Sequence, residues 1–512
     1  MTGSFDRTAN TKRNIIWGVF GRMVIVVGPF ITRSFLIYNL GADYLGISSL
    51  YTSILQVLSL AELGFATAVA YSMYEPISKG DVQEVAGYLN YFRRIYKLVG
   101  LAILVVGLAL MPFLGLFVEG DWPPDVNMQL AFAIYLGNTV LSYFMFAYKQ
   151  TLLNAYQRND VVNKVNIVIM TVQYLAQIAV LIAWPNFYSY AVVMPVCTVL
   201  SNCAISIVTD KLLPEYCEKK LKQITIDAGT RKDLHKRVGG LLFQQVCAVT
   251  RNSVDNIVIS TFIGLTAVAS YSNYFMIMSS VLGVLGTIGT SMTAAVGNSV
   301  AIEGKEKNFN DLRLFMFLYA MISIVAAACL VCLYQPFMML WVGADLMLPF
   351  IVVVLFAVYF YVCTIGDIRS VYVNATGIWW ELRWRALAET IVNVVLNLVL
   401  IHVIGLPGVI LSTITSLFFI NFIYGSHLLF KYYFGLDYVK KYYIDHAVYL
   451  LIAVFVCAAT YLLVSNIPGE TLLALIIRGL ATVACSSMML ILVFMRTKRF
   501  KQATRFLTGA GR

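Results

Sequence analysis

Long apolar stretches recur from near the start of this chain to near its end, and only short polar segments separate them. A helix needs about 20 consecutive, mostly apolar residues to cross the hydrocarbon core of a bilayer. These stretches leave only 12% of the residues charged, whereas an ordinary soluble domain has about 25%. The sequence therefore predicts an all-α, polytopic membrane protein.

Fourteen of the stretches are long and apolar enough to be spanning helices. They cover residues 14–40, 44–73, 96–118, 128–154, 161–183, 187–209, 238–264, 268–301, 312–335, 347–374, 384–404, 407–431, 446–466 and 471–495. The predicted organisation is a six-helix half over 1–209, a basic cytoplasmic loop at 210–237, a second six-helix half over 238–431, two extra helices over 432–495 and a basic cytoplasmic tail at 496–512.

The two predicted halves begin alike. The first and seventh helices each lead into the next helix through a short glycine turn, at Gly41 and Gly264. Parallel halves around a central cavity are a known plan for transporters, with the substrate site near the middle of the membrane. We therefore expect a cavity between the halves, with the last two helices added outside it.

The lysines and arginines outside these helices all fall on one side of the membrane. The loops on the other side, such as 119–127, contain none. Basic residues are enriched in cytoplasmic loops, so this separation predicts that both termini lie in the cytoplasm. It also accounts for the net charge of +11 without nucleic-acid binding. Adding or removing one helix would destroy the separation, which supports the count of fourteen.

Several charged residues lie inside the predicted helices. A charge at the centre of a bilayer costs about 2.5–3.5 kcal/mol on insertion scales, so such side chains must face one another or a wet cavity. The arginines are Arg22, Arg33, Arg251, Arg369 and Arg478, and the principal acids are Glu62, Asp255 and Asp367.

The arginines point to an anionic substrate. Arg22 and Arg33 are eleven residues apart, about three helical turns, so both project from one face. Arg251 lies near mid-membrane on the seventh helix. We predict that Arg22, Arg33, Arg251 and Arg369 bind substrate. The alternative is structural, with each arginine tied to a buried acid or a backbone carbonyl, and we expect this for Arg478.

The acids have two interpretations as well. Glu62, Asp255 and Asp367 could bind a coupling proton or sodium ion, or they could neutralise neighbouring arginines. Arg251 and Asp255 are four residues apart on a helix, a spacing at which they can pair.

The sequence contains no motif for a cofactor or a metal. It has no GxxxxGK[ST] stretch, no HExxH and no clustered His, Cys and Asp set. The predicted outer loops are short, which argues against a membrane enzyme with an external catalytic domain. We therefore expect neither ATP hydrolysis nor enzymatic activity.

The first hundred residues resemble the opening of a known family. The shared features are a basic start, a helix ending in a Leu-Gly turn, Tyr44-Leu45-Gly46, Ala61-Glu62-Leu63-Gly64-Phe65 and Tyr71. They are similar to bacterial polysaccharide flippases of the multidrug/oligosaccharidyl-lipid/polysaccharide exporter superfamily.

That resemblance implies a function in building cell-envelope polysaccharide. Such flippases are thought to move undecaprenyl-diphosphate-linked oligosaccharide from the inner to the outer leaflet by alternating access. Cationic residues of the first and seventh helices would meet the diphosphate and sugar, and polysaccharide-assembly proteins are expected partners. Two alternatives stay open: a drug or cation antiporter of the same superfamily, whose cavity should be acidic and aromatic, and a membrane polysaccharide polymerase or ligase.

Overall fold

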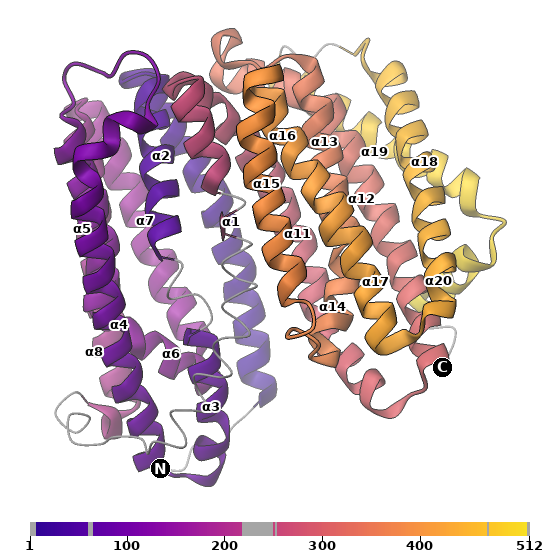
Figure 1. The fold of residues 1–512 in the computed structure, drawn as a ribbon, viewed down its shortest axis with the longest axis horizontal. Helices are drawn as coiled ribbons and strands as arrows, with labels where there is room; N and C mark the ends of the chain where they lie inside the picture. Colours follow the sequence, from indigo (N-terminus) through magenta and orange to yellow (C-terminus); the bar gives the residue numbers. More distant parts are fainter. Residues whose placement is uncertain (1–6, 60–64, 218–248, 251–252, 468–470, 509–512) are drawn as a thin grey trace. The chain divides into compact units, whose positions relative to one another are not determined.

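The computed structural model describes residues 7–59, 65–217, 249–250, 253–467 and 471–508. Within these ranges the chain forms helices and the connections between them, and no β-strand. The chain divides into two compact units, Met1–Val268 and Ala269–Arg512. Figure 1 shows the helices coloured along the sequence.

The first unit contains the helices that precede residue 269. They are α1 (Arg7–Asn39), α2 (Ala42–Leu58), α3 (Phe65–Lys79), α4 (Val82–Leu110), the 3₁₀ turn η2 (Met111–Phe117), α5 (Met128–Phe144), α6 (Ala147–Ala155), α7 (Asn159–Ala183), α8 (Phe187–Leu212), the turn η3 (Pro214–Tyr216) and a helical stretch at 253–262.

The second unit contains most of α11 and all later helices. They are α11 (Leu265–Ile302), α12 (Lys305–Val342), η4 (Ala344–Leu346), α13 (Phe350–Ile365), α14 (Asp367–Thr376), α15 (Arg383–Ile404), α16 (Leu406–Thr415), the π-helical η5 (Ser416–Tyr424), α17 (Gly425–Leu429), the π-helical η6 (Phe430–Phe434), η7 (Leu436–Tyr438), α18 (Val439–Val464), α19 (Leu472–Phe494) and α20 (Lys498–Thr508).

Polar side chains mark where several of the helices begin. Asp81 accepts a hydrogen bond from the backbone N–H of Glu84 at the start of α4, at 2.9 Å. Asn127 does the same for Leu130 at the start of α5, at 2.9 Å. The first N–H groups of a helix have no partner within it, so these caps fix the point at which each helix starts.

The described part of the chain contains ten helices that are long and apolar enough to cross a membrane, and eleven if the bent pair α5–α6 is one span. These correspond to eleven of the fourteen predicted spans. The other three predicted spans are 14–40, where the shorter stretch Met23–Asn39 is apolar, and 44–73 and 238–264, which include residues outside the described ranges. A multi-pass, all-helical membrane protein is thus observed, and the count of fourteen is not confirmed.

The first unit ends after Val268. The sequence analysis places the start of the second half at residue 238, within a stretch that lies largely outside the described residues. The predicted domain boundaries therefore stay a prediction. The two glycines that start the paired turns, Gly41 and Gly264, have the same backbone φ of 119°, a conformation that glycine adopts readily.

Two spans are irregular. The axis bends by 49° between α5 and α6, next to Phe146, whose φ of 51° lies in the left-handed region. The predicted span 347–374 has a milder irregularity, a turn at Gly366 that divides α13 from α14 within the continuous stretch Phe350–Thr376. In membrane transporters such interruptions commonly form binding sites, because irregular backbone at membrane depth must line a cavity or be buried in protein.

The basic tail is a helix that packs against the second unit. In α20, Ala503 joins a buried cluster that includes Phe317, Tyr449 and Phe494. Arg499 contacts the carboxylate of Asp445 at 3.2 Å. The tail is therefore part of the folded bundle.

Candidate functional site

Arg33 is the predicted substrate-binding arginine of the first unit whose side chain the structure describes. It lies half-buried on α1, within electrostatic range of Tyr190 on α8. The α1 helix packs closely on α7, because Gly28 has no side chain and the ring of Tyr174 lies directly against it. A side chain at position 28 would collide with that ring. Arg33 therefore lies on a helix that packs against α7, with its guanidinium group near Tyr190 of α8.

Of the other residues predicted in the first unit, Asp255 is the one whose side chain the structure describes. Glu62 and Arg251 lie outside the described residues, and no side chain is described for Arg22. Asp255 is fully buried in the helical stretch 253–262. Its neighbour Ser253 donates to the side-chain oxygen of Gln56 on α2 at 3.0 Å. Asp255 thus lies on a helix joined to α2 by polar contacts, where its ion-coupling or pairing role stays a prediction.

The first unit also contains a buried ion pair that the sequence analysis missed. Lys149 on α6 is 1% exposed. Its ammonium group contacts both carboxylate oxygens of Asp210 on α8 at 2.7 Å and the hydroxyl of Ser206 at 2.8 Å. These three contacts use all three N–H donors of a lysine, so the charge is both neutralised and hydrogen-bonded. They tie the helix after the α5–α6 bend to α8.

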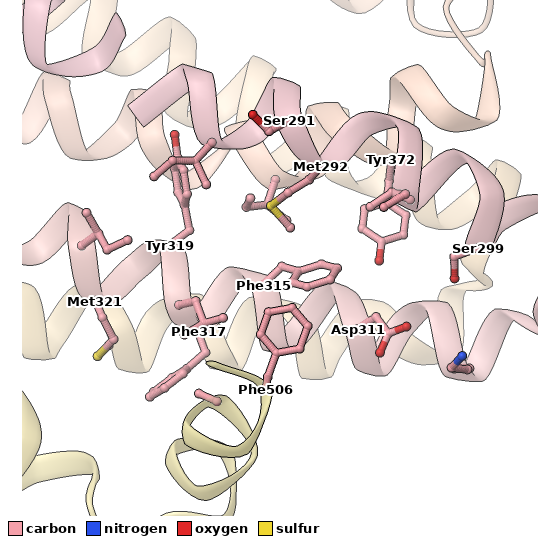
Figure 2. Close-up of a pocket in the computed structure, with 18 of the residues that line it drawn as sticks. Ser291, Met292, Ser299, Asp311, Phe315, Phe317, Tyr319, Met321, Tyr372 and Phe506 are labelled. Carbon is pink, nitrogen blue, oxygen red and sulfur yellow. The ribbon is translucent and has the colours of Figure 1, made fainter. Parts of the chain in front are cut away.

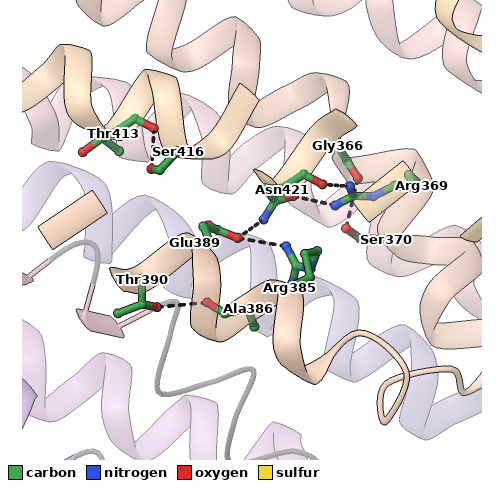
Figure 3. A network of polar contacts seen from close by, with 10 residues as sticks. All are labelled: Gly366, Arg369, Ser370, Arg385, Ala386, Glu389, Thr390, Thr413, Ser416 and Asn421. Carbon is green, nitrogen blue, oxygen red and sulfur yellow. Dashed lines mark hydrogen bonds and ion pairs between the residues drawn. The ribbon is translucent and has the colours of Figure 1, made fainter. Parts of the chain in front are cut away.

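In the second unit, Arg369 belongs to a polar network that Figure 3 shows. Arg369 is 4% exposed and donates to the backbone carbonyl and the side-chain oxygen of Asn421, the latter at 2.5 Å. The amide nitrogen of Asn421 donates to Glu389 at 2.7 Å, and Arg385 donates to the same Glu389 oxygen at 2.8 Å. Three helical segments, α14, α15 and η5, are thereby joined through one carboxylate and one amide.

This arrangement bears on the two interpretations of Arg369. The residue contacts a carbonyl of the π-helical segment η5, the kind of partner that the structural alternative expects. Gly425 makes room for it, because a side chain there would collide with Arg369 and Arg385. Substrate binding by Arg369 stays a prediction, and the observed contacts are those of a residue that positions helices.

Asp367 has a different partner. The hydroxyl of Tyr319 on α12 donates to its carboxylate at 2.6 Å. Asp367 and Arg369 are two residues apart on α14 but take separate partners. Tyr319 in turn lines a cavity, so the carboxylate lies one side chain behind the cavity wall.

That cavity lies among α11, α12, α14 and α20, and Figure 2 shows its lining. Its volume is about 990 Å³ and most of the lining is apolar, including Met292, Phe315 and Phe506. The rings of Phe315 and Phe506 meet edge to face with centroids 5.9 Å apart. Charged groups also line it: Glu303, Lys307 and Asp311. Such a cavity suits a large apolar or aromatic group.

Arg478 agrees with the structural expectation in its contacts. It lies on α19, is 9% exposed and donates to the backbone carbonyl of Ile467 at 3.1 Å.

Among the described residues, no group of three or more His, Cys, Asp and Glu side chains could hold a metal ion.

The pairs that the sequence analysis missed differ in whether the sequence contained a signal for them. Arg385 and Glu389 have the i, i+4 spacing of a helical ion pair, which could have identified them as a pair. Lys149 and Asp210 are 61 residues apart, and Arg369 and Asn421 are 52 apart. Only the packing of distant helices brings these pairs together.

Known proteins similar to this chain were found by comparing structures. No protein-family profile and no curated protein matches the sequence. Among solved structures, the lipid II flippase MurJ in an inward closed conformation is similar over 94% of this chain and 99% of its own length, with a TM-score of 0.66 and 16% identity.

Multidrug transporters are similar too. An inward-facing MATE family transporter of the MOP superfamily matches over 80% of this chain and 97% of its own length, with a TM-score of 0.60 and 15% identity. The MATE multidrug transporter DinF-BH matches over 84% of this chain and 97% of its own length, with a TM-score of 0.61 and 16% identity.

These matches define the fold as that of multi-pass helical membrane transporters. More particularly, the chain has the fold that the MurJ flippase shares with MATE transporters, consistent with the resemblance noted for its first hundred residues. The similar proteins are a flippase and multidrug transporters. At about 16% identity the likeness concerns the fold, and the substrate is a separate question.

Proposed function

We propose that this chain is a flippase that moves undecaprenyl-diphosphate-linked oligosaccharide from the inner to the outer leaflet of a bacterial plasma membrane by alternating access. Its product would feed cell-surface polysaccharide assembly. The observation that carries the proposal is the extent of the structural likeness. The match to MurJ covers 94% of this chain, and those to the two MATE transporters cover 80% and 84%.

The high coverage of the match to MurJ means that the C-terminal helices of this chain are largely included in it. A match over 94% leaves about 31 of the 512 residues uncovered, fewer than half of the stretch from Val439 to Thr508, which contains α18, α19, α20 and their connections. Most of this C-terminal group therefore lies within the MurJ-like part. It packs against α12 through the buried cluster around Phe317 and Phe494, as an integral part of its unit.

The chemistry of the substrate agrees with the charges in the first unit. A diphosphate brings at least two negative charges into a region of low dielectric, where a fixed guanidinium attracts it strongly and can bind two oxygens at once. Arg33 lies inside the first unit, and we propose that it acts with Arg22 and Arg251. We assign Arg369 mainly to holding α14 against η5, because its guanidinium is engaged by Asn421.

A second candidate is a multidrug or cation antiporter, and one observation favours it. The cavity in the second unit is lined by aromatic rings and by Asp311, and Lys307 there already pairs with Glu303. An acidic, aromatic cavity is what a cationic aromatic drug requires. In that case Asp255, Asp367 or Glu62 would bind the coupling proton or sodium ion.

A binding experiment separates the two candidates. Full-length protein in lipid nanodiscs is titrated with undecaprenyl diphosphate, undecaprenyl monophosphate and a cationic rhodamine dye. The flippase proposal expects the diphosphate to bind at least about tenfold more tightly than the monophosphate, because one charged hydrogen-bonded contact contributes about 1.5–3 kcal/mol. Tight binding of the rhodamine dye with no binding of either lipid would overturn it in favour of the antiporter.

Variants test the residues. Arg33→Ala and Arg251→Ala should each weaken diphosphate binding by about tenfold or more, and Arg251→Lys should retain part of it because the charge survives without the bidentate fork. Arg478→Ala is the matched control, since Arg478 donates to a backbone carbonyl. If Arg33→Ala and Arg251→Ala bind the diphosphate normally, the anion-binding role assigned to these arginines is wrong.

A further inference from the structure

A second cavity lies in the first unit, among α3, α4, α5, α6 and α8, and its lining is polar. Its volume is about 350 Å³, within the usual range of about 300–1,000 Å³ for small-molecule sites. Hydroxyl and amide side chains dominate: Ser142, Gln150, Thr151, Asn154, Ser201 and Asn202. So many hydrogen-bonding groups around one space are costly unless something polar meets them.

The cavity exists because a helix is interrupted. Ser142 lies near the end of α5, and Gln150 and Asn154 lie on α6, after the 49° bend. A straight helix would continue along α5, whereas the bend turns three polar side chains of α6 toward one space. The Lys149–Asp210 ion pair holds α6 against α8 in this orientation.

Hydrogen bonds within the protein engage some of the polar groups that line this cavity, and other polar groups have no such partner. Ser201 donates to the side-chain oxygen of Asn166 at 3.1 Å, and Asn202 donates to the carbonyl of Thr198 at 2.9 Å. The side-chain oxygen of Asn154 is buried and has no hydrogen-bond partner among the described residues. A buried acceptor without a partner costs free energy, so a donor from a ligand or from water is expected there.

The charge of the lining limits what that ligand can be. No Asp, Glu, Lys or Arg belongs to the described residues that line this cavity. The nearby ammonium of Lys149 is fully engaged by Asp210 and Ser206. A diphosphate or a cationic drug would therefore bury its charge without a counter-charge, which is strongly unfavourable. A neutral group rich in hydroxyls meets these side chains without that cost.

We propose that this cavity binds a neutral sugar residue of the lipid-linked substrate, which rests on the proposed function and adds a glycan-binding subsite to it. The sugar hydroxyls donate to Asn154 and accept from Gln150, and the ring replaces the water that fills the cavity otherwise. Glycan recognition is thereby separated from diphosphate recognition, because the arginines are not part of this lining.

The test compares two lipids that differ only in the sugar. Full-length protein in nanodiscs is titrated with undecaprenyl diphosphate and with undecaprenyl-diphosphate-linked N-acetylglucosamine. Wild type should bind the sugar-bearing lipid more tightly, by about three- to tenfold for each hydrogen bond gained. Asn154→Leu and Gln150→Met keep the side-chain size but remove the polar atoms. Each should abolish most of this difference and leave the affinity for the sugar-free lipid within about twofold.

A matched control comes from α7. The hydroxyl of Thr171 donates to the carbonyl of Ile167 at 2.7 Å and is not part of the lining, so Thr171→Val should behave as wild type. Thermal unfolding of each variant verifies that it folds. Equal affinity of wild type for both lipids, or equal weakening of both lipids in both cavity variants, overturns the subsite. Failure of wild type to bind the sugar-free lipid overturns the proposed function itself.

Discussion

The Lys149–Asp210 pair allows a prediction in which the two partners differ sharply. Lys149 has a side chain that is 2% exposed, whereas that of Asp210 is 35% exposed. Asp210→Asn leaves a buried ammonium without its counter-charge, and breaking a buried pair in this way costs about 3–5 kcal/mol. Lys149→Met leaves a carboxylate that water can reach, so the loss should be only about 1 kcal/mol, as for a partly exposed pair.

The double variant Lys149→Met/Asp210→Asn adds a second check. Once the lysine is gone, replacing Asp210 removes no buried attraction, so the double variant should resemble Lys149→Met and be more stable than Asp210→Asn alone. The measurement is equilibrium unfolding of purified protein in mixed micelles with increasing SDS. If the single variants lose equal free energy and the losses add in the double variant, the two groups do not act as the pair that the structure contains.

Three further outcomes follow from the structure and the predicted topology. Glu389→Gln removes the carboxylate that joins Arg385 to Asn421 and should lower the free energy of unfolding by about 3–5 kcal/mol, more than Arg385→Met in the same SDS titration. A membrane-impermeant thiol reagent should leave Cys217 unlabelled in intact cells and label it after lysis; labelling in intact cells would reverse the predicted topology. If Asp367 exchanges a coupling proton, Asp367→Asn should flatten the pH dependence of transport, and an unchanged pH profile would exclude that role.

Hydropathy predicted where the described helices lie but not how far they extend. The predicted third span begins at 96, whereas α4 begins at Val82, and the predicted ninth begins at 312, whereas α12 begins at Lys305. The additional turns contain charged residues such as Arg93 and Glu306, which a search for apolar residues passes over. A helix continues beyond the hydrocarbon layer wherever its backbone is capped and its polar side chains reach water. For α4 and α12, the apolar length therefore gives a lower bound on the helix length.

The interruptions were harder to anticipate, for a different reason. The predicted spans 128–154 and 347–374 are continuous in hydropathy, whereas in the structure the first bends next to Phe146 and the second has a turn at Gly366. Phe146 has no feature in the sequence that marks a left-handed backbone, because bulky residues rarely adopt one. The helix that follows Phe146, α6, is joined to α8 by the Lys149–Asp210 ion pair, and Gln150 and Asn154 on α6 line the polar cavity.

The distribution of charge supports the proposed substrate by an argument that is independent of the fold. A lipid-linked oligosaccharide has three chemically distinct parts: an anionic diphosphate, a neutral polar glycan and an apolar chain. The first unit contains a half-buried arginine, Arg33, and a polar cavity whose described lining has no carboxylate or ammonium group. A cationic drug uses neither feature, since it is repelled by the first and poorly solvated in the second. Asp311 and the aromatic rings in the second unit are the contrary observation, yet an apolar cavity of about 990 Å³ also accepts a hydrocarbon chain, which needs no charge. Our proposal of a lipid-linked oligosaccharide therefore assigns a part of the substrate to each cavity and to the arginine, whereas the drug interpretation assigns a role to one cavity alone.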